Sequence, residues 1–134
     1  LMASPRVLVI DDNVQSITLV SDILTVNGYS VVTFQDGYDS IKGLDLIKEN
    51  DLPHLIVLDI HMPGFDGFHV FEHIRSKDLY NNVPVMAMTA LAMKDEQEKI
   101  LSAGFDYYVS KPIDVPSFLQ LVASSVQNQE VMNG

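Results

Sequence analysis

Short apolar runs recur along the chain at regular intervals. They cover residues 6–10, 30–34, 54–58, 83–88 and 105–109. The run at 6–10 (RVLVI) is almost continuously apolar, which is typical of a strand covered by helices on both faces. The pattern therefore predicts five short strands.

Each run is followed by a segment in which apolar residues recur at helical spacing. We expect helices over about 13–27, 37–50, 66–74, 94–103 and 114–126. Their starts carry capping residues, with Asp12 or Asn13 before the first helix and Asp114 before the last. Gly28 and Gly104 stand where the first and fourth helices should end. The polar tail at 128–134 is expected to fray.

Strict alternation of strand and helix predicts an α/β fold, with a doubly wound parallel sheet between two helical layers. A chain of 134 residues with 47% hydrophobic residues is long enough for one such domain. We expect a single domain over 1–134, with its core at about 6–127 and the polar tail beyond. In folds of this kind, ligands bind beyond the carboxyl ends of the strands.

Composition narrows the classes of function. Eight Lys and Arg against eighteen Asp and Glu give a formal net charge of −10, and no basic run interrupts the acidic background. Direct nucleic-acid binding is therefore not expected. The chain has no Cys and no apolar stretch close to the ~20 residues of a membrane span, so we expect no thiolate chemistry and a cytoplasmic protein without membrane contact.

Polar residues follow the predicted strands, where the functional site of the fold should lie. They are Asp11 and Asp12, then Asp59, Thr89 and Lys111. Two carboxylates ~4 Å apart repel by about 4 kcal/mol at an effective dielectric constant near 20, so three together need a cation. Carboxylate oxygens suit Mg²⁺ or Mn²⁺, and Mg²⁺ completes its octahedron with water and phosphate oxygens. The strand ends therefore indicate phosphoryl chemistry.

These motifs, in order and spacing, resemble the receiver domain of two-component response regulators. They are Val9-Ile10-Asp11-Asp12, the segment 58–67 (LDIHMPGFDG), Met88-Thr89-Ala90 and Tyr108-Val109-Ser110-Lys111-Pro112. The resemblance spans about residues 6–127 and implies a flavodoxin-like sheet with strand order 2-1-3-4-5 and five helices. It also implies a regulatory phosphoacceptor rather than an enzyme, one that catalyses only its own phosphoryl transfer and dephosphorylation.

The resemblance assigns a role to each strand-end residue. Asp59 would be the phosphoacceptor, while Asp12, Asp59 and the backbone carbonyl of His61 would hold the metal and Asp11 would complete the acidic pocket. Lys111, in a peptide bond to Pro112 that is expected to be cis, would contact the phosphoryl group. Thr89 would bond a phosphoryl oxygen, and Tyr108 would turn inward with it as the switch aromatic. His61 is unusual at its position, and we make no prediction of how its side chain affects phosphoryl lifetime.

The expected partners are a histidine kinase or histidine phosphotransfer protein and a downstream protein. Two other functions fit part of the pattern. A haloacid-dehalogenase-like phosphatase also uses an Asp nucleophile and Mg²⁺, but it needs a second Asp where this chain has His61. A passive pseudo-receiver scaffold would be indicated by the loss of Asp59 or Lys111, and both are present. His69 and His73 have helical metal-binding spacing, but no third ligand is evident.

Overall fold

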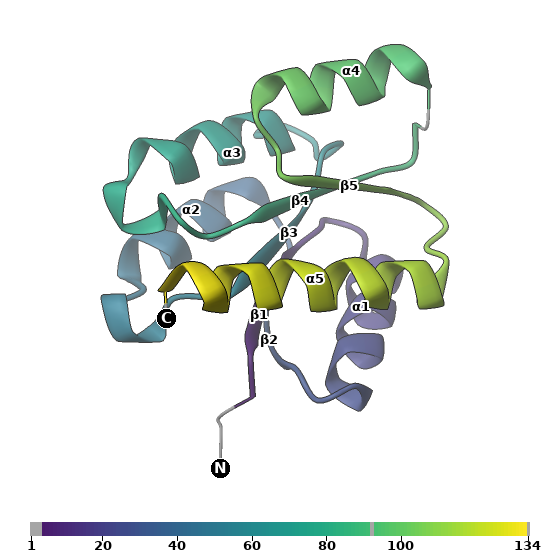
Figure 1. The fold of residues 1–134 in the computed structure, drawn as a ribbon. Coiled ribbons are helices and arrows are strands. Elements are labelled where there is room, and N and C mark those ends of the chain that lie inside the picture. Colours follow the sequence, from purple (N-terminus) through teal and green to yellow (C-terminus); the bar gives the residue numbers. More distant parts are fainter. Residues whose placement is uncertain (1–3, 92, 134) are drawn as a thin grey trace.

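A computed structural model describes residues 4–91 and 93–133, with side chains to residue 127. Its sheet has five parallel strands in the order β2-β1-β3-β4-β5, which confirms the predicted fold (Figure 1). The strands are β1 (Arg6–Ile10), β2 (Ser30–Phe34), β3 (Leu55–Asp59), β4 (Val85–Thr89) and β5 (Tyr107–Ser110). The chain order reverses at β1, which therefore pairs with both β2 and β3.

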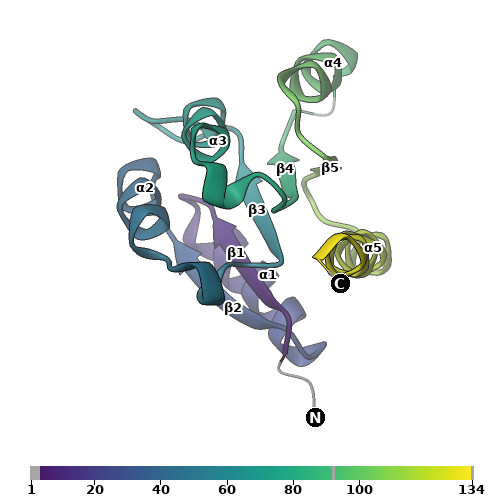
Figure 2. The same cartoon turned by 60° about the vertical axis from the view of Figure 1, so that its left-hand side comes forward.

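Five α-helices cover the two faces of the sheet. They are α1 (Val14–Val26), α2 (Gly37–Leu46), α3 (Gly67–Ser76), α4 (Lys94–Ala103) and α5 (Val115–Asn133), with short 3₁₀ turns at Glu49–Asp51 and Asp78–Tyr80. Buried side chains of α2, α3 and α4 share one core cluster, and those of α1 and α5 share the other. Figure 2 shows α2 and α3 on one side of the sheet and α5 on the other.

Side chains of the central strands alternate between these two clusters. Leu8 and Leu58 join the core under α2, α3 and α4, whereas Val9 and Val57 join the core under α1 and α5. All four are at most 1% exposed. Burial on both faces explains why these strands read as continuous apolar runs rather than as alternating ones.

Several helix ends are specified by the residues that the sequence singles out. Asn13 accepts a hydrogen bond from the backbone N–H of Ser16 at 2.9 Å, and Asp114 accepts one from Ser117 at 3.1 Å. Gly104 ends α4 in the left-handed conformation with φ 108°. Another glycine, Gly67, lies so close to β3 that a Cβ atom there would be 2.5 Å from the carbonyl oxygen of Asp59. Only glycine allows α3 to begin this close to the site.

Some element boundaries differ from the predicted ones. β4 begins at Val85 rather than residue 83, because the N–H of Val83 bonds to Tyr80 in the preceding turn. α2 ends at Leu46 rather than near residue 50, where Ile47 takes an extended backbone conformation. α5 continues to Asn133, whereas the sequence predicts an end near 126 and a frayed tail; no Gly or Pro interrupts 127–133. Within the described residues, no helix is both long and apolar enough to cross a membrane.

Candidate functional site

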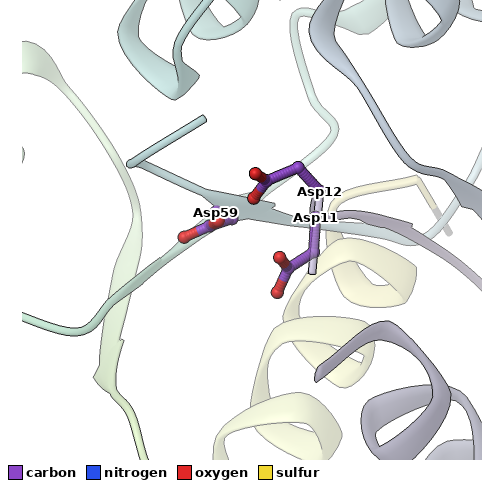
Figure 3. Close-up of side chains that lie close together, drawn as sticks. All are labelled: Asp11, Asp12 and Asp59. Carbon is purple, nitrogen blue, oxygen red and sulfur yellow. The ribbon is translucent and has the colours of Figure 1, made fainter. Parts of the chain in front are cut away.

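The polar residues after β1, β3, β4 and β5 meet at one edge of the sheet. Strand register brings them together, since Ile10 is level with Leu58, Asp59 with Met88, and Thr89 with Ser110. One carboxylate oxygen from each of Asp11, Asp12 and Asp59 lies within 4.8 Å of the other two (Figure 3). The predicted convergence of the three carboxylates is therefore present in the fold.

Lys111 links β5 to the two buried carboxylates. Its Nζ donates to Oδ2 of Asp11 at 2.9 Å and lies 3.6 Å from Oδ1 of Asp59. Oδ1 of Asp11 accepts the backbone N–H of Asn13 at 2.9 Å, so both of its oxygens have partners. The peptide bond from Lys111 to Pro112 is cis, as expected. A fixed cation and two anions thus form a partly neutralised cluster at the base of the pocket.

This neutralisation is incomplete at Asp59. Burial and, after it, the negative charge of Asp11 raise the pKa of Asp59 from 3.8 to about 7, although the Lys111 ammonium opposes both effects. Keeping a carboxyl group with this pKa ionised near neutral pH costs the folded state free energy. A divalent cation among the three carboxylates would remove that penalty.

The donor set fits a hard divalent cation. Three carboxylates offer only oxygen ligands, and Asp12 is the most solvent-accessible of the three, so a hydrated ion can reach them. Among the described residues, no other group of three His, Asp or Glu side chains lies close enough to hold a metal. The cluster is therefore compatible with a divalent metal.

The two predicted switch residues, Thr89 and Tyr108, do not bond to each other but to different partners. Thr89 is fully buried, and its Oγ1 accepts the backbone N–H of Leu91 at 3.0 Å. The hydroxyl of Tyr108 accepts a hydrogen bond from Nε2 of Gln97, on α4, at 3.0 Å. Gln97 is absent from the residues singled out in the sequence, because only the docking of α4 beside β5 brings it to Tyr108.

Three of the four histidines each contact a different acidic side chain. His61 contacts Glu96 at 2.9 Å, His69 contacts Asp66 at 2.9 Å, and His73 contacts Asp45 at 2.8 Å. His69 and His73 therefore point to different carboxylates and do not form a shared metal site. Glu96, like Gln97, was not identified from the sequence, since it is 35 residues from its partner.

Comparison with known proteins identifies the family. Residues 7–123 match the family model of the response regulator receiver domain, so the chain belongs to that family. It is 35% identical over 118 residues to the polar-differentiation response regulator DivK of Brucella anthropi, covering 88% of this chain and 93% of the relative. The DivK protein of Brucella ovis is 34% identical over the same length and coverage.

Solved structures show the same architecture. The Vibrio cholerae chemotaxis protein CheY4 superposes with a TM-score of 0.82 at 23% identity, covering 92% of this chain and 99% of that one. The receiver domain of the sensor histidine kinase PA1611 from Pseudomonas aeruginosa, described with a magnesium ion in its active-site cleft, has a TM-score of 0.82 at 26% identity and covers 93% and 99%. The predicted family and fold are both confirmed.

Receiver domains are regulatory phosphoacceptor domains of two-component signalling. The family match therefore favours this class over the phosphatase that the Asp motifs also allow.

Proposed function

We propose that this chain is a phosphorylation-dependent switch whose phosphoacceptor is Asp59. The observation that carries the proposal is the position of the Asp59 carboxylate at the end of β3, 3.6 Å from the Lys111 ammonium and beside the carboxylates of Asp11 and Asp12. The donor would be the phosphohistidine of a histidine kinase or phosphotransfer protein. A carboxylate oxygen of Asp59 attacks phosphorus, the phosphorus–nitrogen bond breaks, and the imidazole leaves.

Asp12, Asp59 and the backbone carbonyl of His61 would hold Mg²⁺ or Mn²⁺, with Asp11 completing the acidic pocket. The bound cation would neutralise the developing charge on the transferred group. Lys111 can contribute without leaving Asp11, because an ammonium group carries three donors. One donor remains with Asp11 and another is free for a phosphoryl oxygen.

The surface beside Lys111 offers a place for the donor protein. A groove of about 480 Å³ runs from α1 to the loop after β5 and is lined by residues that include Ser16, Leu19, Ala90 and Ile113. Leu19 is 52% exposed. Because this apolar groove adjoins the Lys111 side of the site, a domain seated in it can present its histidine to Asp59. We therefore propose the groove as the docking surface of the phosphohistidine donor.

Thr89 is suited to carry the signal from the site to Tyr108. Its hydroxyl accepts the N–H of Leu91 but keeps its own proton to donate. A phosphoryl group on Asp59 brings about two negative charges and three acceptor oxygens, which draw the Thr89 hydroxyl and the β4–α4 loop inward. The Tyr108 ring can then move into the space vacated, and the surface of α4, β5 and α5 changes for a downstream protein.

Phosphorylation by a small donor tests the proposal. Incubation with acetyl phosphate and Mg²⁺ should add one phosphoryl group by mass, and this group should be lost on treatment with hydroxylamine, as expected for an acyl phosphate. EDTA should prevent the gain. No mass gain would contradict the proposal, as would a group that resists hydroxylamine. Sustained hydrolysis of p-nitrophenyl phosphate would favour the phosphatase instead.

Replacing Thr89 by Ala should separate phosphorylation from its distant effect. The variant still has Asp59, Lys111 and the acidic cluster, so it should accept the phosphoryl group, at a slower rate. Without the hydroxyl, amide NMR shifts around Tyr108 and α4 should be markedly smaller than in the phosphorylated wild type. Thr89→Ser retains the hydroxyl and is the matched control. If both variants show wild-type shifts, the signal does not pass through Thr89.

A further inference from the structure

A polar contact connects the segment after Asp59 to α4. Nε2 of His61, two residues after Asp59, lies 2.9 Å from Oε1 of Glu96. The His61 side chain is 46% exposed, whereas that of Glu96, in the first turn of α4, is only 14% exposed. Glu96 is therefore packed against the protein, and His61 is the more exposed partner.

The chemistry of the His61–Glu96 pair identifies which side chain is the hydrogen-bond donor. An ionised carboxylate only accepts hydrogen bonds, so Nε2 of His61 must carry the hydrogen. The same residue reaches the site through its backbone, since the His61 N–H stabilises the charged form of Asp59. One residue thus contacts the proposed phosphoacceptor through its main chain and α4 through its side chain.

A phosphoryl group on Asp59 would create a second acceptor for this donor. Its oxygens carry about two negative charges, whereas Glu96 carries one. His61 is two residues from Asp59, and because its side chain is 46% exposed, it can turn away from Glu96 without displacing the core. It cannot bond to both acceptors through the same N–H.

We infer, on the basis of the proposed function, that Glu96 is a positioning residue, which holds the His61 imidazole on α4 until a phosphoryl group at Asp59 competes for it. Exchange of this acceptor releases the first turn of α4 from the β3–α3 loop. This link to α4 is separate from the one through Thr89, because the contact joins His61 directly to Glu96 and involves neither Thr89 nor Tyr108.

Binding of beryllofluoride, a stable analogue of the phosphoryl group, measures this competition. Glu96→Ala removes the competing acceptor, so at saturating Mg²⁺ and one fixed pH it should bind beryllofluoride about twofold to fivefold more tightly than wild type, the range expected for a partly exposed pair. In a His61→Ala background the same substitution should change nothing. Glu96→Gln retains an acceptor oxygen, so its affinity should lie between those of wild type and Glu96→Ala.

Glu98→Ala is the matched control. It makes the same charge change on the same helix, but Glu98 is 63% exposed and pairs only loosely with Lys94, at 4.0 Å. The inference is overturned if Glu98→Ala tightens binding as much as Glu96→Ala does, if Glu96→Ala leaves the affinity unchanged, or if its effect persists without His61. Failure of the wild type to bind beryllofluoride would instead contradict the proposed function.

Discussion

Asp59→Asn is expected to accept no phosphoryl group from acetyl phosphate and yet to be more stable than the wild type in metal-free buffer at pH 8. The side chain it replaces is buried, and burial together with Asp11 raises its pKa from 3.8 to about 7. The difference between these two pKa values corresponds to at most ~4 kcal/mol, and the interactions of Asp59 with Asp11 and Lys111 reduce what one substitution recovers. We expect a gain of about 2–3 kcal/mol in the free energy of unfolding.

The sign of the pH dependence follows from the direction of the shift. Because the folded state binds the Asp59 proton more tightly than the unfolded state, this group stabilises the fold least when it must ionise. Its contribution to the unfolding free energy therefore falls as pH rises from about 4 to about 7 and stays low above that. The stability difference between Asp59→Asn and wild type should be small at pH 4 and reach its maximum above pH 7.

Urea denaturation at a series of pH values, in EDTA, measures this difference. Asp22→Asn, an exposed substitution on α1, controls for the general loss of negative charge. A constant difference across the pH range would show that Asp59 is not the carboxyl group whose pKa is raised in the folded state. Labelling of Asp59→Asn at the wild-type rate would place the phosphoacceptor elsewhere.

Mg²⁺ is expected to raise the melting temperature of the unphosphorylated wild type by about 8–12 °C once its concentration exceeds Kd by about a hundredfold. The ion relieves repulsion among Asp11, Asp12 and Asp59, and it binds only the folded arrangement that brings them within 4.8 Å. Asp12→Ala should lose most of this response, because Asp12 is the most accessible of the three ligands.

Calorimetry at matched ionic strength separates specific binding from screening of the −10 net charge. Asp22→Ala, which removes one negative charge from α1, should retain the full Mg²⁺ response. Equal responses in wild type and Asp12→Ala would place the metal away from the carboxylate cluster. If Asp12→Ala and Asp22→Ala lose the Mg²⁺ response equally, the effect comes from the general loss of negative charge.

Much of this architecture could be predicted from the chain because its local signals agree. Continuous apolar runs specify buried strands, and Asn13, Gly104 and Asp114 mark helix ends that the structure retains. Boundaries were less predictable where neighbours decide them, as at Val83, whose N–H bonds to Tyr80 in the turn before β4. The order of the strands came from resemblance, since the alternation of strands and helices is compatible with several orders.

The functional site was likewise predictable from the sequence only in part. The sequence by itself determined that Asp11, Asp12, Asp59, Thr89 and Lys111 follow strands, and parallel strands bring such residues to one edge of the sheet. Only the tertiary structure decided that Lys111 bonds to Asp11 at 2.9 Å, that Gln97 reaches Tyr108, and that Glu96 reaches His61. These pairs depend on how β5 and α4 dock against the rest of the fold, and contacts between residues 11, 35 and 100 positions apart leave no periodic trace in the chain.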